Sequence, residues 1–229
     1  ISGPHIRVGN PLYKTPRKTC ENKAAYDPLD LVLLPEDYLP RVNYVPACNA
    51  EAYRILTPAV PWDGGRPVTE FYRLAFRRQL SQSGERTLIP AILPPGAGHI
   101  HPVLSFTAQT ETALVHLAAL CSSLVYDFLT KTTGRGDLYE SVLRTYPIPS
   151  GNTELRARVL LLNCLTRPYA HLWEECWDTD FSQDSWAKRD ERLSADRFRT
   201  LTKQWTRDTP LRTDYERRQA LVEIDVLAA

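Results

Sequence analysis

Apolar and basic residues alternate along residues 72–80 more regularly than anywhere else in the chain. The alternating positions are Tyr72, Arg73, Leu74, Ala75, Phe76 and Arg77. A period of two with aromatic residues predicts a half-buried strand whose arginines lie on its open face. A polar turn at 81–85 and an apolar run at 87–93 predict the second strand of a hairpin. Residues 104–106 and a segment from 139 to 149 are expected to add short strands to the same mixed sheet.

Residues 107–132 are apolar on most sides and predict one long buried helix packed against that sheet. Ser105 or Thr107 could cap its start, and Gly134 suits the left-handed position after its end. Cys121 lies inside this pattern and is expected to be buried.

Residues 1–62 are rich in proline, which excludes long helices and predicts irregular β structure, including a strand at 30–34. After a boundary at Ser150–Asn152 the pattern becomes helical, with repeats at 154–170 and 214–229. The expected fold is therefore α/β (α+β): a domain over 1–150 with a mixed sheet and one buried helix, followed by an all-α helical spacer over 151–229.

Composition is typical of a folded protein. The 229 residues are 43% hydrophobic and 24% charged, with a net charge of +1 and a mean hydropathy of −0.35. No apolar run approaches the roughly 18–20 residues that span a bilayer, and no signal peptide opens the chain. The five cysteines include no CxxC pair, which favours a reducing cytoplasm and argues against zinc. The absence of methionine indicates a piece of a longer protein.

Basic residues gather locally although the net charge is small. Within residues 64–86, five arginines (Arg66, Arg73, Arg77, Arg78 and Arg86) accompany two acids, Glu70 and Glu85, and residues 86–110 contain no acid. A second basic cluster near the start consists of Lys14, Arg17 and Lys18. A local positive patch is therefore expected, and a strongly basic surface is not.

Several phrases of the sequence are similar to one family. They are Val8-Gly9-Asn10-Pro11-Leu12-Tyr13-Lys14-Thr15-Pro16, Pro35-Glu36-Asp37-Tyr38-Leu39-Pro40-Arg41, Arg86-Thr87-Leu88-Ile89, Ile92-Leu93-Pro94-Pro95-Gly96, Leu162-Asn163-Cys164-Leu165-Thr166 and Arg217-Arg218-Gln219-Ala220-Leu221-Val222-Glu223-Ile224-Asp225. Together they resemble the target-recognition region that follows the catalytic domain in type IIG restriction-modification enzymes and in BREX and DISARM phage-defence methylases. The resemblance covers nearly the whole chain.

This resemblance implies a bacterial DNA-reading module whose parent is an adenine-N6 methyltransferase using S-adenosylmethionine. The module itself is expected to be non-catalytic, because the chain has no Asn-Pro-Pro-Tyr-type motif and no Gly-rich cofactor loop. Gly9-Asn10-Pro11-Leu12-Tyr13 lacks the second proline. The cofactor pocket would then lie in the catalytic domain of the same parent chain, outside this sequence.

Candidate contacts to double-stranded DNA are basic residues, which could bind phosphates or a guanine edge. They are Arg73, Arg77, Arg78, Arg66, Lys14, Arg17, Lys18, Lys131 and Arg135. The alternative for the strand arginines is a solvated face with cross-strand ion pairs. Arg86 is expected to pair with Glu85 or to cap the turn.

Other motifs are weaker. His99-Ile100-His101 has metal-like spacing but no third ligand nearby, and is more often a polar loop. Arg135-Gly136-Asp137 matches an adhesion tripeptide that recurs by chance. Glu21-Asn22-Lys23 has the form of a nuclease motif but lacks a preceding strand. Tryptophans 173, 177, 186 and 205 could stack on bases, although helical spacing favours a core role.

A second hypothesis is a protein–protein adaptor, in which the helical half docks on a partner of a defence complex. A contiguous positive concavity formed by Arg73, Arg77 and Lys131 would favour DNA. Scattered arginines paired with acids would favour the adaptor. The two hypotheses therefore make opposite predictions about the surroundings of the same side chains.

Overall fold

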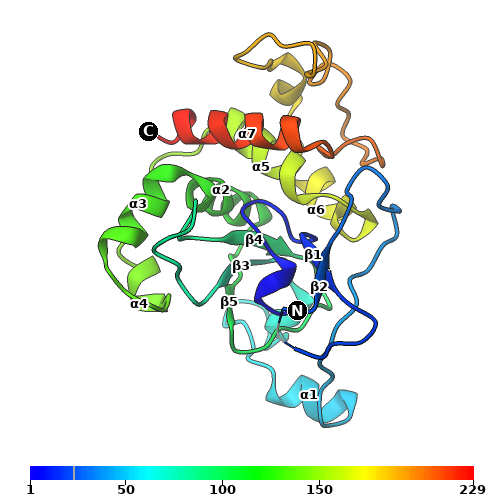
Figure 1. Ribbon diagram of the computed structural model, residues 1–229, viewed down its shortest axis with the longest axis vertical. Coiled ribbons are helices and arrows are strands. Elements are labelled where there is room, and N and C mark those ends of the chain that lie inside the picture. The colour runs from blue at the N-terminus through cyan, green and yellow to red at the C-terminus, as the bar shows by residue number, and fades with distance from the viewer. Residues whose placement is uncertain (23) are drawn as a thin grey trace.

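The computed structural model describes residues 1–22 and 24–229, and its centre is a three-stranded antiparallel sheet (Figure 1). The strand order is β4-β3-β5, with Leu74 opposite both Ile92 of β4 and Phe106 of β5. The strands are β3 (Arg73–Arg77), β4 (Pro90–Leu93) and β5 (Val103–Phe106). The three expected central strands are thus confirmed, but the expected mixed sheet is wrong, because both strand pairs are antiparallel. The strand expected at 139–149 is wrong: α4 (Glu140–Leu143) and irregular chain occupy that segment.

Both faces of the sheet are covered. Leu74, Phe76 and Ile92 point into the main core with α2 and α5. On the other face, Ala75 and Leu93 pack with Ile6 of the N-terminal segment, which crosses in front of the sheet in Figure 1. The expectation of a half-buried strand with an open arginine face is therefore wrong. Period two shows which residues share a face, but a distant segment decides whether that face meets water.

The helix expected at 107–132 is divided at Ser123 into α2 (Glu111–Ser122) and α3 (Leu124–Thr132), which are bent by 68°. Ser123 has extended backbone, and its hydroxyl accepts from the N–H of Tyr126 as the cap of α3. Thr110, rather than Ser105 or Thr107, caps α2. Gly134 follows α3 with φ of +64°, as predicted.

The bent pair α2 and α3 is also the only membrane-related signal in the described part of the chain. No single helix there is long and apolar enough to cross a membrane, and the two helices reach that length and apolarity only together. Most side chains of α2 are buried inside the protein, which is the ordinary position of a core helix.

The proline-rich segment 1–62 contains little regular structure, as expected. Leu31 and Leu34 are buried in a small cluster with Leu165, but residues 30–34 form a turn, so the strand predicted there is wrong. Alternation is absent in this run, and its length alone could not separate a strand from a buried turn. The elements are a short 3-10 turn η1 (Gly3–His5), the paired strands β1 (Lys14–Pro16) and β2 (Tyr26–Pro28), α1 (Ala50–Leu56) and, just beyond, η2 (Val68–Glu70).

The C-terminal part contributes helices to the same core. Leu160 of α5 and Ile224 of α7 belong to one hydrophobic cluster with Leu74 of the sheet. No helix or strand lies between residues 184 and 213, so an all-α spacer is not confirmed, and the division at Ser150–Asn152 stays a prediction. The elements are α5 (Thr153–Asn163), η3 (Arg167–Tyr169), α6 (Ala170–Glu175), η4 (Thr179–Gln183) and α7 (Asp214–Leu227).

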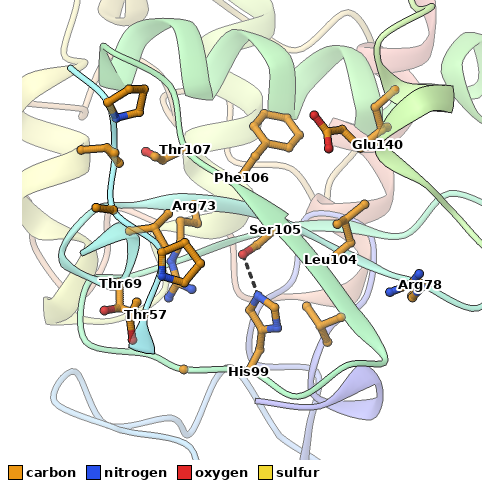
Figure 2. Close-up of a pocket in the computed structure, with 18 of the residues that line it drawn as sticks. Thr57, Thr69, Arg73, Arg78, His99, Leu104, Ser105, Phe106, Thr107 and Glu140 are labelled. Carbon is orange, nitrogen blue, oxygen red and sulfur yellow. Dashed lines mark hydrogen bonds between the residues drawn. The ribbon is translucent and has the colours of Figure 1, made fainter. Parts of the chain in front are cut away.

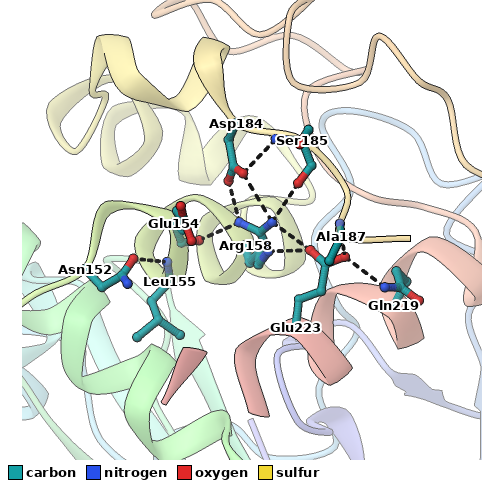
Figure 3. A network of polar contacts seen from close by, with 9 residues as sticks. All are labelled: Asn152, Glu154, Leu155, Arg158, Asp184, Ser185, Ala187, Gln219 and Glu223. Atoms are coloured by element: carbon teal, nitrogen blue, oxygen red, sulfur yellow. Dashed lines mark hydrogen bonds and ion pairs between the residues drawn. The ribbon is translucent and has the colours of Figure 1, made fainter. Parts of the chain in front are cut away.

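Arg158 carries a buried charge into the middle of α5 (Figure 3). Its side chain is 3% exposed and forms ion pairs with Glu223 of α7, at 2.6 Å, and with Asp184. Glu223 also accepts from the backbone N–H of Ala187 at 2.9 Å. The network therefore attaches the irregular segment after η4 to α5 and α7. This segment forms no helix or strand, so it has no regular backbone hydrogen bonds to hold it in place.

Gly9 joins three separate parts of the chain. Its N–H donates to Pro90 O of β4 at 2.9 Å, and its carbonyl accepts from Arg217 Nη2 of α7 at 2.8 Å. Its φ is +61°, and a Cβ atom there would lie 3.1 Å from Leu162 Cδ1. Residues 8–12 are all buried. This phrase therefore fastens the N-terminal segment to the core and is closed to a nucleotide.

Candidate functional site: two basic loops and an apolar groove

Two of the predicted DNA-binding arginines lie inside the protein. Arg73 is 1% exposed, and Nη2 donates to Ala97 O. Arg77 is half-buried and donates from Nε to Ile6 O at 2.9 Å. Burial lowers the pKa of both guanidinium groups. Neither side chain faces bulk water as the alternating pattern predicted: the N-terminal segment covers Arg77, and Arg73 lies against Ala97 at the wall of the groove described below.

Most of the other predicted residues are scattered. Arg66 pairs with Asp63 and Glu70, and Arg17 pairs with Asp27 at 2.9 Å, so acids already neutralise them. Two further predicted residues are Lys14, whose Nζ lies 5.2 Å from the Tyr13 ring centroid, and the exposed Lys18. Arg86 binds Asp225 at 2.8 Å, so the expected pairing with Glu85 or the turn is wrong. Glu85 instead pairs with Arg7.

Three predicted residues do come together, at one end of the sheet. The segment 78–86 and the segment 131–139 lie side by side there, and we refer to them as the basic loops. Leu138 N donates to Arg78 O at 2.7 Å, and Leu80 N donates to Gly136 O at 2.9 Å. The basic residues of these loops are Arg78, Lys131 and Arg135, together with Arg86, which Asp225 neutralises; the loops also contain two acids, Glu85, which pairs with Arg7, and the exposed Asp137.

The outer residues of the basic loops are suited to polar recognition. Lys131 and Arg135 are exposed, and Arg78 is half-buried with its guanidinium carbon 5.1 Å from the Tyr139 ring centroid. Among the residues that the structure describes, these three cations form no ion pair. Gln79 and Gln82 are exposed beside them, and the Gln82 amide donates to Arg135 O at 3.1 Å. Guanidinium groups and amides are the side chains that bind phosphates and base edges.

No family model matches the chain. The comparisons with curated proteins and with solved structures likewise found no match.

An apolar groove with a volume of about 1140 Å³ lies beside β5 (Figure 2). One wall consists of α1 and the segment that follows it, through residue 62; β5 and α4 supply the other walls. The apolar side chains that line it include Leu56, Val60, Trp62, Leu104, Phe106, Leu117 and Leu143. The helix α1 buries no side chain of its own, so the groove has one wall that is held only lightly.

Polar groups gather on the floor of the groove. His99 Nδ1 lies 3.2 Å from Ile100 O, and Nε2 lies 2.7 Å from Ser105 Oγ. A carbonyl oxygen can only accept, so Nδ1 carries the proton and Nε2 accepts from the Ser105 hydroxyl. Arg73 lies close by in Figure 2 and makes no ion pair with any described residue; its Nε is buried without a hydrogen-bond partner.

Burial lowers the pKa of His99 below 6.5, and the nearby Arg73 guanidinium lowers it further. The unfolded chain therefore binds a proton at this residue at a higher pH than the folded chain does. The contribution of His99 to stability is fully present above about pH 6.5 and is lost as the pH falls below that value. We expect His99→Gln to reduce the drop in thermal midpoint between pH 7.5 and pH 5.5. An unchanged drop in the variant would contradict this assignment.

The remaining sequence motifs have ordinary structural roles. His99 Nε2 bonds to Ser105 Oγ, and His101 Nδ1 lies 3.4 Å from Arg78 Nη1, so the two rings bond to different side chains. No group of three His, Cys, Asp or Glu residues that could hold a metal occurs in the described residues. The tripeptide at Arg135 is part of the basic loops. Lys23 of the nuclease-like motif lies outside the described residues.

Tryptophans at helical spacing pack mainly in the core, which is the role that their spacing favoured: Trp173 is 0% and Trp205 7% exposed.

The apolar groove was not predicted from the sequence. Its one sequence signal is the long acid-free stretch 86–110, which contains His99 and Ser105 and leaves the nearby Arg73 without a counter-charge.

Proposed function

We propose that the chain is a DNA target-recognition module of a bacterial restriction-modification or phage-defence adenine methyltransferase, and that it is non-catalytic itself. The observation that carries the proposal is the pair of basic loops, which brings Arg78, Lys131 and Arg135 together without acid partners among the described residues. S-adenosylmethionine would be bound by the catalytic domain of the parent chain. The resemblance of the sequence phrases gives independent support.

The contacts proposed here differ from those expected from the sequence. Arg77 is withdrawn as a DNA contact because its guanidinium bonds to Ile6 O, and Arg73 is withdrawn because it is 1% exposed at the wall of the apolar groove, where a duplex cannot reach it. Recognition would come from the basic loops, with Arg78 and Arg135 reading base edges or phosphates and Lys131 binding phosphate. Since few cations are involved, we expect the isolated chain to bind weakly and in a salt-sensitive manner.

Anisotropy of a labelled random-sequence duplex, titrated from low to physiological salt, tests the proposal. Changing Arg78, Lys131 and Arg135 to Gln is expected to abolish most binding at low salt. If each cation contacts one phosphate, the slope of log K against log[salt] falls by about 2.7 in magnitude, because each contact contributes roughly 0.9. All three residues are partly or fully exposed, so the variant is expected to fold normally.

The matched control removes the same charge elsewhere. Lys188, Arg192 and Arg199 are exposed cations paired with Asp190 and Asp196, and changing them to Gln should leave DNA binding within about twofold. Equal loss in both triple variants would indicate a nonspecific charge effect. No loss in the basic-loop variant would remove the proposed DNA contacts.

A specific observation favours the adaptor as the second candidate. Arg17, Arg66 and Arg86 are paired with acids, which is the scattered arrangement expected for that class. Apolar side chains also remain exposed in the described segment 39–56, including Leu39, Val45 and Ile55 at 67%, 82% and 77%. Exposed apolar patches mark surfaces that bind proteins. Absence of DNA binding at low salt would favour this candidate.

A further inference from the structure

The two outer edges of the sheet are treated differently. At the β4 edge, Ile92 N donates to Asn163 Oδ1, and Ile92 O accepts from the Tyr169 hydroxyl, both at 2.9 Å. Side chains from α5 and η3 therefore satisfy the backbone groups on that side. An edge closed in this way cannot add another strand.

The β5 edge is open toward the groove. Arg77 N donates to Ile89 O, and Arg78 N donates to Pro102 O. The backbone N–H and C=O groups of odd-numbered β3 residues therefore point toward β4, and those of even-numbered residues point toward β5. Ser105 is opposite Ala75, and its own N–H and C=O must therefore point away from β3. Neither group has a hydrogen-bond partner among the described residues. An unpaired strand edge is a template for a further strand.

The groove supplies what an added strand needs beyond backbone pairing. It runs along this edge with a volume of about 1140 Å³, slightly above the roughly 300–1,000 Å³ of small-molecule sites, and its apolar walls include Leu104, Phe106 and Trp62. Side chains alternate along an extended peptide, so every second residue would meet the apolar wall beside Phe106. The residues between them would face the opposite side, where Ser105, His99 and Arg73 lie.

The charge on that side indicates the chemistry of the occupant. Arg73 is 1% exposed, lines the groove and has an unpartnered buried Nε. Its guanidinium has no carboxylate partner in the described chain, and a buried unpaired cation is unfavourable. A carboxylate arriving with a ligand would form a charge-assisted hydrogen bond there, and the strength of that bond would increase as the groove loses water.

We propose that the groove binds an extended peptide of a partner protein, which pairs with the free edge of β5 and places an acidic side chain against Arg73. The main chain of the peptide would bond to Ser105 N and O, and its apolar residues would pack on Leu104 and Phe106. This is recognition by strand addition, in which main-chain bonds give affinity and pockets for alternate side chains give specificity. Arg78 lines this groove as well as belonging to the basic loops, whereas Lys131 and Arg135 do not line it.

Selection of a random heptapeptide library on the whole 229-residue chain tests the proposal. We expect enrichment of peptides with alternating apolar residues and one acid. In a polarisation assay, changing that acid to its amide should weaken binding about tenfold or more, since a charge-assisted hydrogen bond exceeds 1.4 kcal/mol. Methylating the peptide nitrogen that faces β5 should abolish binding. These two changes leave the protein intact.

Ser105→Pro removes the outward N–H, which an edge strand tolerates because that N–H is not part of the ladder. Ser105→Ala is the matched control, because it loses the hydroxyl and keeps the N–H. We expect Ser105→Pro to lose peptide binding and Ser105→Ala to stay within about threefold of the original chain, since the hydroxyl already bonds to His99.

Three results would overturn the proposal. The first is that selection on the original chain enriches no peptides beyond those enriched by the same selection on Ser105→Pro. The second is enriched peptides that bind Ser105→Pro and the original chain equally. The third is self-association of the chain, seen by light scattering and lost in Ser105→Pro, which would give the edge to a second copy. DNA binding by the basic loops is measured separately, so failure of one proposal does not decide the other.

Discussion

Replacing Arg158 by methionine is expected to lower the free energy of unfolding by about 3–5 kcal/mol, as removal of one partner from a buried ion pair does. The side chain of Arg158 is 3% exposed, and its loss leaves the carboxylates of Glu223 and Asp184 buried without their cation. The segment after η4 would also lose its attachment, because Arg158 Nη2 donates to Ser185 O at 3.1 Å. Urea unfolding measures the change.

Arg144→Met is the control for charge removal. Its partner Glu140 is in the same helix turn, and the two side chains are 76% and 69% exposed, so the expected loss is below about 1 kcal/mol. Adding Glu223→Gln to Arg158→Met should recover part of the loss, since one uncompensated charge is removed with it. Similar small losses for Arg158→Met and Arg144→Met would show that the network contributes no more than a surface pair.

Gly9→Ala is expected to destabilise the protein by about 2–5 kcal/mol, for two reasons that add. A residue with a Cβ is strained by roughly 1–2 kcal/mol at φ of +61°. The new methyl group would also lie 3.1 Å from Leu162 Cδ1 and 3.2 Å from Leu162 Cβ, and overpacking of this kind adds about 1–3 kcal/mol. The thermal midpoint and urea midpoint should both fall.

Gly64→Ala separates the two causes. Gly64 also has positive φ, +55°, but a Cβ there would meet no atom within 4 Å. This control should show the backbone strain alone, about 1–2 kcal/mol. If Gly9→Ala were no worse than Gly64→Ala, the close approach to Leu162 would have no energetic consequence, and the N-terminal segment would not be tightly seated on α5.

Local pattern predicted the central elements well. Alternation identified β3, residue spacing identified α7, and Gly134 was placed correctly because a left-handed residue after a helix is a local requirement. The break at Ser123 was missed, because serine there reads equally as a helix residue and as a cap. The choice is decided by α7: Asp225 Oδ1 accepts from Leu124 N at 2.7 Å and so holds the first turn of α3.

The candidate site was predicted less well than the fold, for a physical reason. An arginine on an alternating strand is interpreted as exposed because burying a guanidinium is costly. Arg77 is nevertheless acceptable inside, because Ile6 O is present to bind it, and that carbonyl is 71 residues away in sequence. Neither the composition nor the periodicity of the sequence can predict that Arg77 bonds to Ile6 O. The free edge of β5 is likewise a property of the sheet order, which the sequence does not show.

The bond between Arg217 and Gly9 has a consequence for how the protein forms during synthesis. The two residues are 208 positions apart, so this contact cannot form until α7 has left the ribosome. Closing so long a loop is entropically unfavourable, and contacts of this separation slow folding. Until then the N-terminal segment lacks its bond to α7, and the core lacks Ala220 and Ile224 of that helix. A nascent chain that stops before α7 would therefore be a substrate for chaperones and proteases.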